Sequence, residues 1–428
     1  GYKALEDYED GAGNGHNTAV GAQSQLNATT GEFNTSLGSL SMGAGVTTGD
    51  DNVAIGYKAG EALTSGGKNV LLGAYSGDSL LQSGRNVAIG YSALSTEDAA
   101  GRSVAIGYAA LEDQNSAAEA YNVAVGYEAG TNITTGKESV IVGGLAGDAI
   151  TTGTRNTLIG YIAGTALVEG GSNVAIGYAA LAGETAHGTN IAIGYNVLTV
   201  QNAGANALNV AIGYNAAGSV TTGVQNVVVG AEAGDAITTA FANAVLGYNA
   251  LGASTIGNSN VAIGKDAMKT NVASDRNVAI GTQALKLMTS ASTVDQYNVA
   301  VGFDAGGAVT SGIKNTIIGS NAGVALTTGD NNIIIGIDAA ASAVGTDNET
   351  VIGTTATTNA KVHGLVKPIV RVTAAVAAGA VFPNSIYHFD DTTARTITLP
   401  DAGSYTPGTI IEFIVSANPG SGVHKIIT

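Results

Sequence analysis

The sequence contains no cysteine and no tryptophan, and its 428 residues include only 5 prolines and 6 phenylalanines. Without cysteine the chain forms no disulfides and no zinc–thiolate sites. Aromatic residues make up 5% of a chain that is 45% hydrophobic, so the core must consist of Ala, Val, Ile and Leu. Because catalytic and ligand-binding domains usually need bulky aromatics to shape their pockets, we expect a thin aliphatic core and no enzymatic activity.

Positive charge is also scarce. The chain has 17 Lys and Arg against 33 Asp and Glu, a formal net charge of −16. A surface that neutralises phosphates needs clustered Lys and Arg, and no such cluster is present along the sequence. No apolar run approaches the ~20 residues that a membrane-spanning helix requires. We therefore expect neither nucleic-acid binding nor membrane insertion.

Glycine, in contrast, is abundant, and much of it ends a repeated motif. Asn-Val-Ala-Ile-Gly occurs at Asn52–Gly56, Asn86–Gly90, Asn173–Gly177, Asn260–Gly264 and Asn277–Gly281. With its looser copies the motif recurs 20 times, most often at a spacing of 17 residues. The longer coils starting at Gly107, Gly194 and Gly281 are 87 residues apart, so a unit of five coils is itself repeated.

The motif is typical of a short strand that is apolar on both faces. The residue before the final Gly is always Val, Ile or Leu, and the residue three before it is β-branched in all copies but one, Ala244. A 17-residue coil is too short for helical repeats, so it fits one turn of a β-solenoid with about two strands and two turns. Proline is missing from residues 1–360, as expected for strands that lie between two others.

Only one face of each strand can point into such a solenoid. We expect the outward face to carry the residue two before the Gly, together with the Gly itself. This Ala/Ile/Leu/Val ladder would lie open to water, and its Gly and Ala would allow other rods to approach closely. Because soluble monomers rarely expose such a stripe, we expect the rods to self-associate along it.

Two further regularities predict structural roles. The Asn four residues before the Gly is expected to close a turn or to form a stacked amide ladder. Four residues after the Gly stands either a second Gly or a Leu. The second Gly has an aliphatic residue three positions later, as in Gly77 and Leu80, whereas the Leu has a polar residue there, as in Leu181 and Glu184. This exchange indicates that one slot in the core is filled from either of two chain positions. The structural repeat anchors are therefore Gly56, Gly90, Gly107, Gly177, Gly264 and Gly281, with Asn52, Asn86, Asn173, Asn260 and Asn277.

The motif, including the Ser-Val-Ala-Ile-Gly of Ser103–Gly107, resembles the head repeats of trimeric autotransporter adhesins, and related repeats occur in bacteriophage tail fibres. The resemblance covers about residues 1–353 and implies a left-handed parallel β-roll intertwined as a homotrimer, although that family's coil is usually shorter than 17 residues. We expect an all-β fold: a parallel β-roll or β-solenoid of about 20 coils over residues 1–357. A small β-rich module with all five prolines should follow over residues 358–428.

The function implied by this resemblance is that of a structural protein, the shaft of a phage tail fibre that presents a host-recognition element. Its location would be the virion or an extracellular surface, and its partners other virion proteins and a host receptor, glycan or protein. The alternative is the passenger of a bacterial trimeric surface adhesin. A polysaccharide-degrading β-helix enzyme is disfavoured, because no acidic cluster interrupts the repeat.

No catalytic, metal or cofactor-binding residues are expected. The residue after the motif Gly is Tyr in ten copies. A stacked aromatic ladder can bind sugar rings, but packing along the sheet is the favoured interpretation. The weak candidates for surface binding are Tyr57, Tyr91, Tyr108, Tyr121 and Tyr297.

The enlarged coils carry their extra residues at one position of the repeat. Loops at that position are expected to be exposed and aligned along one side of the rod. They are Glu6–Asn14, Asp113–Tyr121, Gln201–Leu208 and Thr289–Tyr297. Because the sequence begins inside a repeat at Gly1 and ends in an apparent strand, we expect it to belong to a longer protein.

Overall fold

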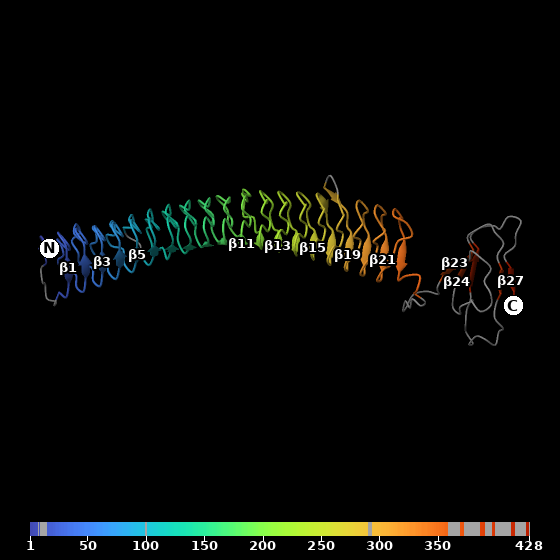
Figure 1. The fold of residues 1–428 in the computed structure, drawn as a ribbon, viewed down its shortest axis with the longest axis horizontal. Helices are drawn as coiled ribbons and strands as arrows, with labels where there is room; N and C mark the ends of the chain where they lie inside the picture. Colours follow the sequence, from blue (N-terminus) through green and yellow to red (C-terminus); the bar gives the residue numbers. More distant parts are fainter. Residues whose placement is uncertain are drawn as a thin grey trace, which may run out of the picture. The chain divides into compact units, whose positions relative to one another are not determined.

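The computed structural model describes residues 1–6, 8, 15–98, 101–289 and 293–357, and five strands beyond them. The chain divides into two compact units, Gly1–Ala356 and Thr357–Thr428; the predicted boundary lies one residue further along. The first unit is a parallel β-solenoid in which each coil contributes one short strand to a continuous sheet (Figure 1). No helix occurs among the described residues, so the predicted all-β solenoid with a 17-residue coil is confirmed.

The sheet has 20 strands of three residues, each ending directly before a motif glycine. Neighbouring strands pair in parallel and in register, so that Val53 faces Val70 and Ala54 faces Leu71. In chain order the strands are β1 (Thr18–Val20), β2 (Thr35–Leu37), β3 (Val53–Ile55), β4 (Val70–Leu72), β5 (Val87–Ile89), β6 (Val104–Ile106), β7 (Val123–Val125), β8 (Val140–Val142), β9 (Thr157–Ile159), β10 (Val174–Ile176), β11 (Ile191–Ile193), β12 (Val210–Ile212), β13 (Val227–Val229), β14 (Ala244–Leu246), β15 (Val261–Ile263), β17 (Val278–Ile280), β19 (Val299–Val301), β20 (Thr316–Ile318), β21 (Ile333–Ile335) and β22 (Thr350–Ile352).

The middle residue of each strand points into the solenoid, and its two neighbours point outward. Leu71 in β4 is fully buried, whereas Val70 and Leu72 are 38% and 37% exposed. The predicted choice of outward face is therefore wrong: the Ala/Ile/Leu/Val ladder lies inside, and the β-branched pair lies outside. The reason is the thinness of the interior, because small Ala side chains on most strands leave room for large ones from the opposite side.

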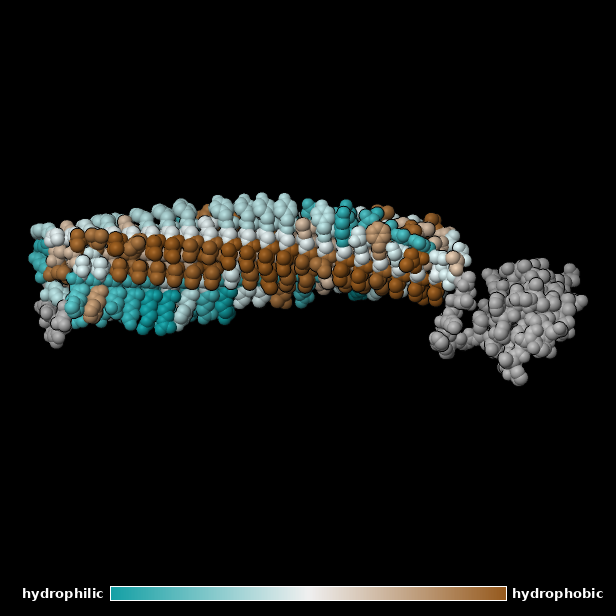
Figure 2. Space-filling model, turned by 60° about the horizontal axis from the view of Figure 1, so that its bottom comes forward, coloured by the Kyte–Doolittle hydropathy of each residue, from teal (hydrophilic) through white to brown (hydrophobic). Residues whose placement is uncertain are grey.

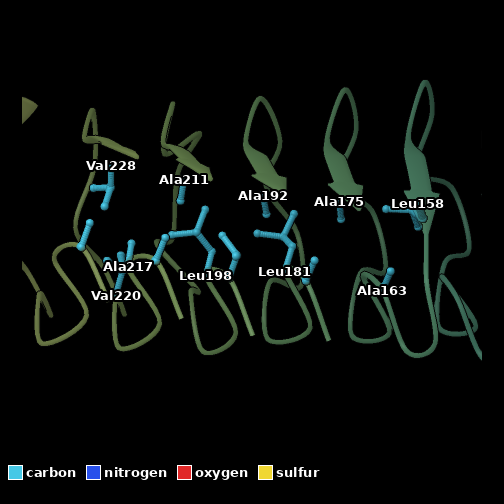
Figure 3. Packing of buried hydrophobic residues seen from close by; sticks show 14 of the residues in the cluster. Leu158, Ala163, Ala175, Leu181, Ala192, Leu198, Ala211, Ala217, Val220 and Val228 are labelled. Atoms are coloured by element: carbon cyan, nitrogen blue, oxygen red, sulfur yellow. The ribbon is translucent and has the colours of Figure 1, made fainter. Parts of the chain in front are cut away.

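The core is a single aliphatic cluster that runs through the solenoid. Figure 3 shows how it is filled: Ala192 and Ala211 on the strands face Leu181 and Leu198 from the turns. Where the strand supplies a large residue, Leu158, the turn opposite supplies Ala163 (Figure 3). Large residues thus meet small ones across the interior, as close packing of a thin core requires.

The side opposite the sheet consists of turns rather than the predicted second strand. Lys58 and Gly60 both have φ of 59°, and the equivalent positions of other coils are left-handed too. Lys58 N–H donates to Ser39 O in the preceding coil at 3.1 Å, and Gly60 N–H donates to Ser76 O in the next coil at 2.9 Å. These residues keep the coils hydrogen-bonded, but left-handed residues cannot form a regular strand. Among the described residues of this unit, only two further short strands occur outside the large sheet, β16 (Ser274–Asp275) paired with β18 (Val294–Asp295).

The motif glycine is required by its conformation and by the next coil. Gly177 has a φ of 128°, and a Cβ atom at this residue would lie 2.1 Å from the carbonyl oxygen of Gly194. At Gly56 the corresponding φ is 140°, and the distance to Gly73 O would be 2.4 Å. The glycine therefore permits close contact between coils of one chain, not the approach between rods that the sequence suggested.

The Asn residues of the motif form the predicted amide ladder. Asn52 Oδ1 accepts hydrogen bonds from the backbone N–H of Asn69 at 3.0 Å and from its Nδ2 at 3.1 Å. Asn52 Nδ2 donates to Gly66 O, one turn of the solenoid later, at 3.0 Å. Where Ser139 replaces Asn, its hydroxyl accepts the N–H of Asn156 at 3.1 Å. The ladder satisfies backbone groups that are buried at this corner.

The complementary filling of one core slot is also confirmed. A Cβ atom on Gly77 would lie 2.5 Å from Leu80 Cδ1, so the two positions compete for the same volume. In coils of the other kind Leu181 fills the slot, and the polar Glu184 that follows is itself fully buried. Its carboxylate is satisfied by the backbone N–H groups of Thr185 and His187, each at 3.1 Å.

Five strands of the C-terminal unit are described, and all their pairings are parallel: β23 with β24, β24 with β26, and β25 with β27. They are β23 (Ile369–Arg371), β24 (Ile386–Phe389), β25 (Thr396–Thr398), β26 (Glu412–Val415) and β27 (Lys425–Ile427). This unit therefore contains β-structure in the region where a β-rich module was predicted.

Candidate functional site

The outer face of the 20-stranded sheet is an exposed aliphatic stripe. The first and third residues of its strands point outward, and none of them is charged. Figure 2 shows the result as a hydrophobic band that runs along the solenoid. The most exposed members of the band are Val20, Leu37, Val70, Leu72, Val140, Ile159, Val227, Leu246, Ile280, Ile318, Ile333 and Ile352.

An uncovered band of this extent favours association with another apolar surface, because burial removes hydrocarbon from water. The band is continuous and presents the same two outward positions in every coil, because the strands pair in register along the whole sheet. A second copy of the chain offers the same repeat and therefore matches it along its length. The sequence predicted an exposed apolar face correctly, although it assigned the wrong residues to it.

Tyrosine side chains form ladders along the coils, and all of them except Tyr75 stand in the position after the motif glycine. Tyr91 and Tyr108 stack at a centroid distance of 5.4 Å and an interplanar angle of 8°. Tyr57 makes an edge-to-face contact with Tyr75, which in turn contacts Tyr91. A second stack contains Tyr161, Tyr178, Tyr195 and Tyr214, with centroid distances between 4.9 and 6.0 Å.

This geometry favours packing over sugar binding for most of the ladder. Tyr91 has a neighbouring ring on either side, as does Tyr108, which stacks on Tyr127 at 5.3 Å. A sugar ring needs an open aromatic face, and only the ends of each stack retain one. The stacked rings therefore brace adjacent coils, as the favoured interpretation of the sequence proposed.

The other two candidate tyrosines lie elsewhere, at the ends of enlarged loops. Tyr121 OH donates to Glu119 and accepts from Arg102 of the preceding coil, and Arg102 also pairs with Glu119 at 2.9 Å. The hydrogen bond to Glu119 raises the pKa of Tyr121. The trio of Arg276, Asp295 and Tyr297 repeats the arrangement, with Tyr297 OH 2.7 Å from the guanidinium. Both tyrosines therefore hydrogen-bond the end of an enlarged loop to an arginine of the preceding coil.

The enlarged loops leave the solenoid at one coil position, as predicted. Asn115 N–H donates to Thr134 O at 2.9 Å, and Asn202 N–H donates to Thr221 O at 2.8 Å. Both threonines occupy the same position in the next coil. The residues that follow, including Ala118 and Asn206, are exposed. Most of the stretch 6–14, and residues 290–292 of the last loop, lie outside the described residues.

No cluster of metal-ligating side chains is assembled by the residues that the structure describes. Groups of three or more His, Asp or Glu side chains able to hold a metal ion do not occur among them. Within the same residues no helix has the length and hydrophobicity to cross a membrane. Comparison with protein-family models, curated proteins and solved structures finds no match to this chain.

Proposed function

We propose that this chain is the shaft of a fibre of the kind that bacteriophage tails use, and that it holds a host-recognition element away from the virion. The observation that carries the proposal is the aliphatic stripe, which extends without a charged residue over 20 in-register strands. A binding module or an enzyme needs a local site, whereas this feature is repeated in every coil. Repetition along an axis is what a spacer requires.

The described contacts suit a load-bearing rod. Each coil is joined to the next by strand pairing, by the Asn ladder and by turn hydrogen bonds such as Gly60 N–H to Ser76 O. These contacts recur along the length of the solenoid, so stability accumulates between neighbouring coils. The glycine contact between Gly177 and Gly194 holds neighbouring coils at one close distance.

Self-association completes the proposed shaft. Three copies that turn their stripes toward a common axis bury the band in a closed assembly, whereas a single copy leaves it in water. The three-fold arrangement follows the resemblance to trimeric adhesin heads; the need for a cover follows from the exposed residues, of which Leu246 is 49% exposed.

Antibodies raised against the 428-residue chain provide a test of the function. In electron microscopy they are expected to label the tail fibres of virions, and added before infection they should reduce adsorption. Labelling confined to the surface of bacterial cells would contradict the proposal and favour the adhesin passenger. Release of reducing ends from host polysaccharide by the purified chain would instead indicate an enzyme.

A further inference from the structure

One corner of the solenoid contains a polar groove of about 520 Å³ that spans several consecutive coils. Its lining includes Gly67, Gly84 and Gly101, which occupy the same position in successive coils, six residues before the motif glycine. Hydroxyl and amide side chains from Ser65 and Gln82 also line the groove. The three successive glycines open the surface here, because most other coils place a side chain at this position.

Basic residues stand beside these glycines. Lys68, Arg85 and Arg102 each follow one of the three glycines directly, so the stacked coils bring them into one row at a repeat of ~4.8 Å. Lys68 and Arg85 are exposed, and neither makes an ion pair among the described residues. Along the sequence these residues are 17 apart and form no cluster, and only the stacking of the coils brings them into a row.

The backbone at the same position also lacks acceptors. In several other coils an Asp of the next coil accepts the N–H of the residue six before the motif glycine. Glu32 N–H donates to Asp50 Oδ1 at 2.8 Å, and Ile313 N–H donates to Asp330 Oδ1 at 2.8 Å. In the groove the next coil offers only glycine, and the N–H groups of Gly67 and Gly84 have no acceptor among the described residues.

We propose that this groove binds a linear acidic glycan, with carboxylates of neighbouring sugars taking the places that Asp side chains occupy in other coils. Each carboxylate would accept from a free N–H group, Gly67 or Gly84, and pair with the adjacent cation, Lys68 or Arg85. Backbone N–H groups beside a cation form a strong anion site. Ser65 and Gln82 supply hydrogen-bonding groups for the sugar hydroxyls.

Acidic groups at the two ends restrict the ligand. Asp50 and Asp51 lie on the coil before Lys68, with Asp50 accepting a hydrogen bond from Glu32 N–H, and Glu119 neutralises Arg102 at 2.9 Å. Two unpaired cations, Lys68 and Arg85, therefore remain between these three carboxylates. This arrangement fits a short anionic ligand that spans the two coils of Lys68 and Arg85, and it disfavours a long polyanion, whose further charges would meet the carboxylates at either end.

The test is fluorescence anisotropy of the full 428-residue chain with a labelled hexamer of galacturonic acid. Saturable binding that weakens with added salt is expected. The double variant Lys68→Gln/Arg85→Gln should bind at least about tenfold more weakly, since two charge-assisted contacts are lost. Arg155→Gln, which removes an exposed cation at the same coil position outside the groove, should bind like the wild type. All variants should melt at the wild-type temperature, because the substituted side chains are exposed.

Three comparisons are able to overturn the proposal. The methyl-esterified hexamer has the same backbone without the charge, so equal binding would contradict carboxylate recognition. Equal binding of a single-stranded DNA oligomer would indicate a nonspecific anion surface, and monomeric galacturonate that competes as well as the hexamer would contradict a chain-binding groove. An unchanged affinity in the double variant would place the ligand elsewhere. The proposal stands independently of the fibre function, because none of these readouts depends on assembly.

Discussion

The buried carboxylate of Glu184 accepts a hydrogen bond from Gln201 Nε2 of the next coil at 3.2 Å. Gln201 Oε1 in turn accepts from Asn209 Nδ2 at 3.0 Å, so the core polar pair is joined to the amide ladder. One five-coil unit earlier, Glu97, Gln114 and Asn122 repeat this connection. The polar residues occur where Leu side chains from four positions after the glycine already fill the core.

This arrangement leads to a prediction about the shared core slot. Glu184→Leu should destabilise the chain by about 1–3 kcal/mol, because Leu181 already occupies the space and the new side chain overpacks it. Adding Leu181→Gly frees the slot for the new leucine and should recover part of the lost stability, with Gln201 Nε2 still lacking its carboxylate acceptor. It also removes a leucine from a left-handed conformation, φ 53°. Urea unfolding measures both effects; a double variant no more stable than Glu184→Leu would refute competition for one slot.

A second prediction concerns the motif glycine. Gly177→Ala should cost at least about 2 kcal/mol, because backbone strain and the contact with Gly194 O both oppose a Cβ atom. Gly204→Ala is the matched control: its φ is 69°, but nothing lies within 4 Å of the added atom. It should cost only about 1 kcal/mol, the price of the left-handed conformation. Equal losses in thermal unfolding would show that contact between coils is not the constraint.

A third prediction concerns acid stability and uses two carboxylates of opposite behaviour. Burial, followed by the charge of Glu232, raises the pKa of Asp235 above its ordinary value of 3.8. Hydrogen bonds from the Ser342 hydroxyl and N–H lower the pKa of Glu349 below its ordinary value of 4.5. Ionisation therefore disfavours the folded state at Asp235 and favours it at Glu349.

The sign of each effect on unfolding follows from linkage. The folded protein loses stability at Asp235 as pH rises from 3.8 through the raised pKa, so Asp235→Asn should stabilise at pH 7. At Glu349 stability is lost as pH falls from 4.5 through the lowered pKa, so Glu349→Gln should destabilise at pH 7. Both differences should vanish once the carboxylates are protonated in both states. Unfolding midpoints measured from neutral to acid pH check this; shifts of the same sign for the two variants would contradict it.

The sequence was most informative where a residue recurs in every coil. All 20 strands of the large sheet, including β14 with its exceptional Ala244, lie directly before their motif glycines. The amide ladder at Asn52 was also predictable, and so was the filling of one core slot by either Leu80 or Leu181. In both cases the same surroundings recur in coil after coil and select the same kinds of residue. Repetition lets weak local preferences add up to a firm assignment.

Features that depend on the relation between coils were harder to predict. Alternation within β4 shows that Val70 and Leu71 face opposite ways but not which faces the core, because both are apolar. The turn side was mistaken for a strand, since residues such as Lys58 and Leu181 give no local sign of a left-handed conformation. The row of Lys68 and Arg85 was missed because its members are neighbours only after stacking.

The self-association of the sheet face is tested most directly by molecular mass in solution. Sedimentation equilibrium of the chain should give about 126 kDa, three times 42.1 kDa. Val227→Lys/Leu246→Lys places charges on the stripe at residues that are 47% and 49% exposed, so the chain should fold but sediment as a monomer. Val200→Lys, at an exposed position away from the large sheet, should remain a trimer. A wild-type chain that sediments at 42.1 kDa across the concentration range would contradict the account.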